Sequence, residues 1–288
     1  MRISQELRDR VVELDRRYRS TWDAHAIAHV LGMSPTTAAK ILREERGPRP
    51  KRAKEPHTRR TRFIGRDVMW SSDFVRLGWG WLLIKTIDEM SGFRLGWELC
   101  RSETAEAAVA HARSIIARMG RAPLVWKYDH GSAFTSGAFQ KLLACHKIVA
   151  YPTHPRAPWT NGRVERDHQE ILNWLIALEG KDVTRELLER EIDEGMWMLN
   201  YVKPRAVLGF KKSAEVYFKA LGTGEIPREQ FLGKVLEYEV QIGMMGTERT
   251  WRKAIRMAMQ YWEVYEEWTA LPWWDKDVNR TRSENVSF

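Results

Sequence analysis

Residues 67–100, "DVMWSSDFVRLGWGWLLIKTIDEMSGFRLGWELC", contain three strand-like segments in succession. The first two are separated by the turn GWG, and the third follows the sequence MSG. Segments rich in β-branched and aromatic residues, bounded by glycine turns, are typical of neighbouring strands in a sheet. This stretch therefore predicts the first three strands of a folded domain that begins at Asp67.

Downstream of these strands, helical and strand-like segments alternate up to about residue 200. Gly120 marks the end of one helix, because glycine is the usual residue after a helix C-terminus. The further elements are a helix at 104–120, a strand at 123–129, a helix at 136–146, a strand at 147–153 and a helix that starts near Thr160. This order predicts an α/β core over 67–200, a mixed five-stranded sheet flanked by helices on both faces.

Residues 1–45 predict a separate all-α domain of three helices. Gly32 supplies a tight turn, Ser34 is suited to cap the next helix, and Pro35 suits its first position. This spacing resembles a helix-turn-helix, whose second helix enters the major groove of DNA, although an ordinary small helical bundle would show the same periodicity. The residues expected to face DNA from that helix are Thr36, Thr37, Lys40 and Arg43.

Residues 46–66 are rich in proline and basic residues, which predicts an extended linker. It is either a passive tether or an arm along the DNA backbone, and we favour the arm. Its candidate DNA contacts are Arg49, Lys51, Arg52, Arg59, Arg60 and Arg62. Residues 201–288 predict a mainly helical, aromatic-rich extension with a long helix over 250–268, and this extension is the candidate subunit contact.

The bulk composition favours a nucleic-acid partner. The formal net charge is +9 and no apolar run reaches the roughly 18 residues of a membrane span, so a polyanion other than a lipid surface is expected. Cys100 and Cys145 give no disulfide framework and suit the reducing cytosol. His25 and His29 have metal-ligand spacing, but they lack a nearby C-x-x-C, so a zinc finger is excluded.

Three carboxylates stand at the ends of core elements: Asp73 in the first strand, Asp129 after the fourth, and Glu165 at the start of the following helix. If the first and fourth strands are neighbours, the two aspartates lie side by side and the helix can bring Glu165 to them. Clustered carboxylates repel one another unless cations neutralise them, and oxygen ligands suit Mg²⁺ or Mn²⁺. A pair of such ions supports phosphoryl transfer.

The motifs "WSSDF", "IDEMSGFRLGW", "YDHGSAFTS" and "THPRAPWTNGRVERDHQEIL" stand in this order, followed by "LNYVKPRAVLGFKKSAEVY". Together they resemble the DDE transposases of bacterial insertion sequences, which have a retroviral-integrase-type catalytic core. The resemblance covers about residues 70–217 and implies a ribonuclease H-like fold. It also implies that Asp73, Asp129 and Glu165 bind two Mg²⁺ or Mn²⁺ ions, and it places Asp88 in a turn outside this triad.

The expected function is that of a DNA transposase, which cuts element ends to give 3′-OH groups and joins them to target DNA. Its partners would be terminal inverted repeats, target DNA and further copies of the chain in a dimer or larger assembly; a helper ATPase is left open. A bacterial, nucleoid-associated, cytoplasmic location is expected. Lys127, Arg163 and Arg166 are candidate phosphate contacts or ordinary surface bases. Two alternatives stand: a catalytically inactive DNA-binding regulator derived from a transposase, and a ribonuclease H-like nuclease without joining activity.

Overall fold

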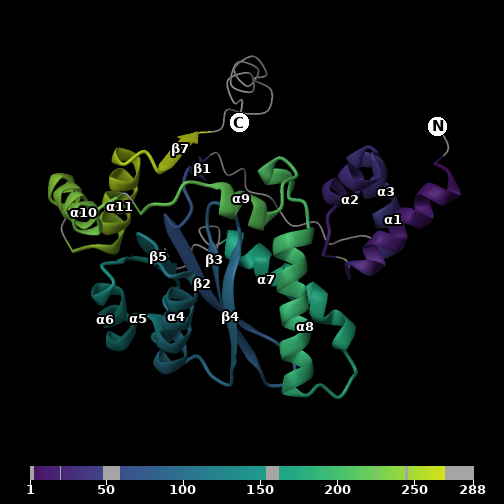
Figure 1. The fold of residues 1–288 in the computed structure, drawn as a ribbon, viewed down its shortest axis with the longest axis horizontal. Coiled ribbons are helices and arrows are strands. Elements are labelled where there is room, and N and C mark those ends of the chain that lie inside the picture. The colour runs from purple at the N-terminus through teal and green to yellow at the C-terminus, as the bar shows by residue number, and fades with distance from the viewer. Residues whose placement is uncertain are drawn as a thin grey trace, which may run out of the picture.

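A mixed five-stranded sheet lies at the centre of the computed structural model, which describes residues 3–19, 21–47, 59–153, 162–224, 226–243 and 246–269 (Figure 1). The strand order is β4-β3-β2-β5-β6, with β2, β3 and β4 antiparallel and β5 and β6 parallel to β2. The strands are β2 (Met69–Arg76), β3 (Leu82–Asp88), β4 (Arg94–Cys100), β5 (Val125–Tyr128) and β6 (Val149–Pro152). The predicted mixed five-stranded α/β fold is confirmed, and its first and fourth core strands, β2 and β5, are neighbours.

Helices cover both faces of this sheet. On one face, Trp70, Ile84 and Trp126 pack under the helices that follow β4 and β5. On the other face, Val75 and Leu83 pack under the helices that follow β6. The first set is α4 (Ala105–Met119), α5 (Ser132–Thr135) and α6 (Gly137–Cys145); the second is α7 (Gly162–Leu175), η2 (Ile176–Leu178), α8 (Arg185–Trp197) and η3 (Met198–Val202). Alternate side chains of each strand thus reach opposite cores.

The N-terminal domain consists of α1 (Gln5–Arg17), α2 (Ala24–Leu31) and α3 (Pro35–Arg46). Gly32 ends α2 in the left-handed conformation at φ 64°, and the Ser34 hydroxyl accepts a hydrogen bond from the Thr37 amide to start α3. The expected three helices and the expected turn and cap residues are therefore present.

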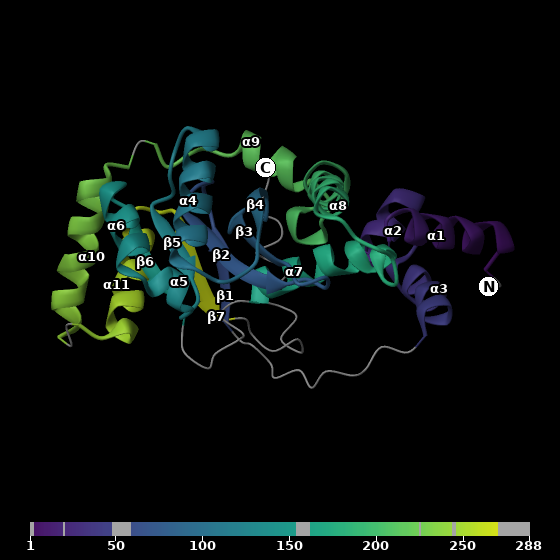
Figure 2. The same ribbon diagram turned by 90° about the horizontal axis from the view of Figure 1, so that it is seen from below.

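This domain packs against the core next to α7 and α8 (Figure 2). Trp22 and Ile27 share one hydrophobic cluster with Leu188 and Ile192 of α8. Arg19 forms an ion pair with Glu191 at 2.5 Å, which adds a polar contact between the two parts. The N-terminal helices and the second face of the sheet thus form a continuous hydrophobic core.

Helices α10 and α11 of the C-terminal extension lie at the opposite end of the molecule from α1–α3 (Figure 2). Trp251 donates a hydrogen bond to the Ala150 carbonyl of β6 at 2.8 Å, and Trp262 packs against the same cluster as Val149. The extension therefore packs these half-buried aromatic residues against β6 at the edge of the central sheet. Its elements are η4 (Ala206–Leu208), α9 (Ser213–Lys219), α10 (Arg228–Ile242), α11 (Glu248–Tyr261) and β7 (Tyr265–Thr269).

The predicted long helix over 250–268 is wrong beyond Tyr261. Glu263 has a left-handed φ of 56°, and the chain then forms β7, which pairs antiparallel with β1 (Arg59–Phe63). Opposite charges meet across this pairing, since Arg62 lies opposite Glu266. The helical periodicity of the sequence does not decide the structure after Tyr261, because β1 of the basic linker is available to pair with β7. Cross-strand pairing overrides local propensity here.

Candidate active site

Two neighbouring parallel strands bring Asp73 and Asp129 to the same end of the sheet. Ser71 of β2 pairs with Lys127 of β5, and each aspartate lies two residues further along its chain. Side chains two residues apart on a strand share a face. Asp129, just after β5, accepts a hydrogen bond from the Gly131 amide at 3.0 Å. The register of β2 and β5 thus meets the condition under which the two aspartates come to the same end of the sheet.

The two aspartates repel each other in the absence of a cation. Burial and the negative charge of Asp129 together raise the pKa of Asp73 to about 7, against a hydrogen bond from the Phe74 amide. Because charged oxygens this close are costly without a counter-charge, the pair has the properties of a divalent cation site.

Helix α7 runs past Asp73 and carries the third predicted carboxylate, Glu165, in its first turn. His168 of α7 contacts Asp73, with Nδ1 3.8 Å from Oδ2. Glu165 is exposed and lies three residues before His168, so both side chains are on the same flank of the helix, about 4.5 Å apart along its axis. Burial and the positive charge of Lys85 lower the pKa of His168 to about 3, which keeps the imidazole neutral beside Asp73.

The three predicted ligands are not gathered around a single point. Across the part of the chain that the structure describes, no three His, Cys, Asp or Glu side chains are grouped closely enough to hold a metal ion. The structure thus brings Asp73 and Asp129 together and leaves Glu165 at the edge of the site. Asp88 is fully buried and accepts hydrogen bonds from the Ser91 amide and hydroxyl, which gives it a structural role in the turn after β3.

A buried ion network fastens α7 to the sheet on its other flank. Asp167 forms ion pairs with Lys85 of β3 and Arg94 of β4, and all three side chains are at most 3% exposed. The two cations keep the pKa of Asp167 well below its usual range, although burial alone would raise it. A charge buried without its partner is strongly destabilising, so this network fixes the position of α7 along the sheet.

One turn further along α7, Glu170 extends the network towards the N-terminal domain. Its carboxylate binds Arg94 at 2.7 Å and Lys203 at 3.0 Å. The Lys203 ammonium also donates to the carbonyl of Thr21, in the loop between α1 and α2, at 2.5 Å. The helix that carries Glu165 is therefore held by the sheet and linked to the N-terminal domain.

Two of the predicted phosphate contacts have partners within the protein. Lys127 is buried and binds the Glu89 carboxylate at 2.8 Å. Arg163 lies 3.5 Å from the same carboxylate and donates to the Met90 carbonyl at 3.2 Å. These two cations lower the pKa of Glu89 to about 2, against the effect of burial. Arg166, by contrast, is exposed, and no ion pair links it to another described residue.

The predicted contacts of the N-terminal domain lie on the surface of α3. Thr36, Lys40 and Arg43 are exposed, whereas Thr37 is half-buried and its hydroxyl shares a hydrogen bond with Ser34. In the linker, Arg62 is exposed and Arg59 and Arg60 belong to β1. Arg49, Lys51 and Arg52 lie outside the described residues.

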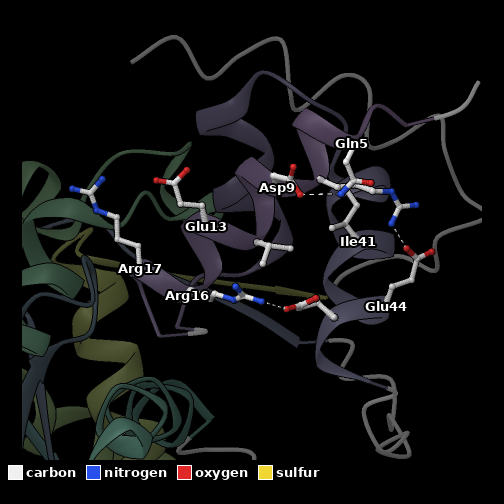
Figure 3. Close-up of a pocket in the computed structure, with 10 residues that line it drawn as sticks. Gln5, Asp9, Glu13, Arg16, Arg17, Ile41 and Glu44 are labelled. Atoms are coloured by element: carbon white, nitrogen blue, oxygen red, sulfur yellow. Dashed lines mark hydrogen bonds and ion pairs between the residues drawn. The ribbon is translucent and has the colours of Figure 1, made fainter.

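A groove of about 940 Å³ runs between α1 and α3 (Figure 3). Charged side chains bridge it, including the ion pairs Arg8–Glu44 at 2.5 Å and Arg16–Glu45 at 2.8 Å. Neither Lys40 nor Arg43 lines this groove. Lys40 nevertheless lies four residues before Glu44, whose pKa is lowered by Arg8 and by Lys40, so the basic face of α3 adjoins its contact with α1.

Comparison with known proteins identifies the core. Residues 65–158 match the family model of the integrase core domain. A structure of the simian T-cell lymphotropic virus intasome in complex with PP2A regulatory subunit B56 gamma contains a chain that is similar over 75% of this protein and 77% of its own length, with 20% identity and a TM-score of 0.51. The central domain has the integrase catalytic-core fold.

Two smaller integrase structures are also similar to the chain. The catalytic core of the HTLV-2 integrase in complex with magnesium shares 22% identity over 54% of this chain and 99% of its own, with a TM-score of 0.46. The catalytic core of the BIV integrase shares 21% identity over 53% and 95%, with a TM-score of 0.44. No curated protein matches the sequence. The match to the integrase core family supports a polynucleotidyl transferase class for this integrase-like core.

Within the described ranges, none of the helices combines the length and apolar character needed to cross a bilayer.

Sequence reasoning missed the buried network around α7. Lys85 is the only charged residue within the apolar run "WLLIKTI", and that isolated charge was a detectable sign of a buried partner. Its partner Asp167 lies 82 residues away, between Arg166 and His168 in a segment that looks solvated. Only the packing of α7 on the sheet identifies the pair.

We predict that Lys85→Met lowers the free energy of unfolding by about 3 kcal/mol, because Asp167 loses one of its two buried counter-charges. Urea unfolding at pH 7 measures the change. Arg185→Met is the matched control. It removes the ion pair between Arg185 and Glu189, in which the Arg185 side chain is 53% exposed, and an exposed pair contributes little to stability. Equal stability losses in the two variants would contradict the importance of the buried network.

We also predict a pH-dependent effect of Asp73→Asn in metal-free protein. The pKa of about 7 in the folded state exceeds the usual value of 3.8, so the stability contributed by the protonated carboxyl is lost as pH rises from about 4 through 7. Asparagine does not titrate. Between pH 5 and pH 8, the free energy of unfolding of the variant should therefore rise relative to that of the wild type by about 2 kcal/mol. Thermal unfolding in EDTA measures this difference. The exposed Asp182→Asn variant, as control, should not reproduce this trend.

Proposed function

We propose that this protein is a metal-dependent DNA transposase or integrase that cleaves element ends to give 3′-OH groups and joins these ends to target DNA. The observation that carries the proposal is the pairing of Asp73 and Asp129 at the end of β2 and β5, inside the segment that matches an integrase core domain. Helix α7 runs past this pair and adds Glu165 on the flank that contacts Asp73.

The residues present fit a divalent cation. Asp73 and Asp129 would hold it, with Glu165 as the third ligand. Burial and the charge of Asp129 raise the pKa of Asp73, and a bound cation would favour its charged form. Two Mg²⁺ or Mn²⁺ ions, when bound, would activate a nucleophile and stabilise the leaving oxygen in phosphoryl transfer. The neutral His168 lies beside Asp73, and the buried Asp167 network holds the helix in place.

The DNA-binding surface that we propose combines the N-terminal domain with the core. The exposed residues of α3 would contact the terminal inverted repeat, as the second helix of a helix-turn-helix does. The formal net charge of +9 supports contacts with the phosphate backbone. We retain Arg62 and Arg166 as candidate contacts, whereas Lys127 is buried and paired with Glu89, so we give it no DNA contact in this proposal.

The joining reaction also bears on the assembly of the protein. Two element ends must be cut and joined together, so a dimer or larger assembly on DNA is proposed. The protein would act in the bacterial cytoplasm, at the nucleoid. Trp273 and Trp274 of the proposed subunit contact lie outside the described residues. Trp251 and Trp262 pack against a hydrophobic cluster of the same chain.

We predict that Asp129→Asn and Glu165→Gln each reduce strand joining by about 100-fold or more, because each removes one carboxylate from the proposed cation site. Binding of the element end should be unchanged. The assay uses a labelled duplex copied from the inverted repeats that flank the gene, with Mg²⁺ or Mn²⁺ and plasmid target. Glu179→Gln is the control, because this exposed residue lies beyond α7.

The products of this assay separate the proposal from its alternatives. Labelled strands longer than the donor show joining, and shorter strands alone would indicate a nuclease without joining activity. Binding of the end by the wild type, without cleavage in either metal, would indicate a DNA-binding regulator. Undiminished joining by Asp129→Asn would refute the assigned site.

A further inference from the structure

A small cavity lies beside α7, on the flank opposite Glu165. It has a volume of about 200 Å³ and is lined by Arg163 and Arg166 of α7, by Arg205 just before η4, and by the turn at Ser91–Gly92. We call these residues the arginine pocket. Arg163 and Arg166 are three residues apart and so share one flank of the helix, whereas Glu165 points away from both. The pocket is therefore separate from the proposed cation site but belongs to the same helix.

The arginine pocket has more positive than negative charge. Arg205 lies 3.9 Å from the Glu170 carboxylate, but that carboxylate already binds Arg94 and Lys203 at 3.0 Å or less. Arg166 is exposed and makes no ion pair with another described residue. The acids that reach the pocket are thus shared among several cations, and an anion would be attracted to it.

Arg205 has an unused donor inside the pocket. Its side chain is 12% exposed, and its buried Nη1 atom has no hydrogen-bond partner among the described residues. A buried donor without an acceptor costs free energy, and buried polar atoms are nearly always paired, so a ligand oxygen is the natural partner.

The turn at Gly92 makes room for this guanidinium. Gly92 has a φ of +65°, and a Cβ atom at this position would lie 3.2 Å from Arg205 Nη1. Any larger residue would both strain the turn and crowd the unpaired donor. The sequence and the backbone together therefore keep the Arg205 guanidinium close against the turn, with its buried Nη1 atom next to Gly92 at the wall of the pocket.

We propose that the arginine pocket binds a backbone phosphate of DNA, with Arg205 and Arg166 as its main donors. The guanidinium fork matches the geometry of phosphate oxygens. Arg166 is exposed at the rim, which suits a phosphate on a large polymer rather than a fully enclosed small anion. The inference rests on the proposed function, because a phosphate bound across α7 from Glu165 would hold the strand against the helix that carries this carboxylate.

The test is equilibrium binding of a fluorescent 30-base-pair duplex, measured by anisotropy in EDTA over a series of salt concentrations. Arg166→Met and Arg205→Met should each weaken binding several-fold and lower the slope of log K against log salt by about 0.9, the value for one phosphate contact. The matched control is Arg113→Met, which removes an exposed arginine of α4. Equal effects of the pocket and control variants would overturn the proposal.

Folding and free anions are checked separately. Arg166 is exposed, so its variant should keep the wild-type melting temperature, and Arg205→Lys should keep the charge and recover part of the slope. In calorimetry with inorganic phosphate alone, only weak binding is expected. Tight phosphate binding that Arg205→Met abolishes, with DNA binding unchanged, would identify a free-anion site and overturn the DNA assignment.

The same measurement distinguishes this inference from the proposed function. No divalent metal is present, so the result does not depend on catalysis. If the wild type fails to bind the duplex at all, the proposed function fails. If the wild type binds and the arginine-pocket variants behave like Arg113→Met, the proposed function stands and only the pocket assignment fails.

Discussion

The ion pairs of Asp167 with Lys85 and Arg94 are the constraint on which the rest of the site depends. They are buried between the sheet and α7, and they fix one flank of this helix against β3 and β4. The next residue of α7, His168, contacts Asp73, which lies opposite Lys85 across β2 and β3. Glu165 lies in the first turn of the same helix. A helix held only by its apolar stripe could slide or rotate, whereas charges buried in pairs tolerate little displacement.

The proposed site also illustrates a conflict between stability and function. Asp73 and Asp129 share one end of the sheet, where burial and mutual repulsion raise the pKa of Asp73 to about 7. The metal-free protein is therefore less stable above that pH than a variant without the charge. The arginine pocket has the reverse imbalance, since the acids near it are each shared among several cations and Arg166 adds a further positive charge. In the proposals above, a divalent cation would neutralise the aspartates and a DNA phosphate would neutralise the arginine pocket.

Particular residues show how far the sequence could be interpreted. The glycine turns and apolar strands over 67–100 predicted the first three strands of the core sheet, and Ser34 and Gly32 predicted helix boundaries in the N-terminal domain. The adjacency of the strands that carry Asp73 and precede Asp129 was only a condition in the sequence, and the strand order of the structure meets it. Local propensity failed after Tyr261, where β7 forms because β1 is available as a partner. It also could not separate Lys127, which is buried and paired, from Arg166, which is exposed.

The sequence by itself determined the order of elements and the carboxylates proposed for chemistry, because periodicity, turn residues and motif order are local properties of the chain. The tertiary structure decided which charged side chains have partners within the protein. Lys85 meets Asp167 across 82 residues, and Lys203 reaches both Glu170 and the Thr21 carbonyl. Whether a charged side chain is a solvated base, a structural counter-ion or a ligand-binding donor depends on burial and on distant partners, and these exist only once α7 packs on the sheet.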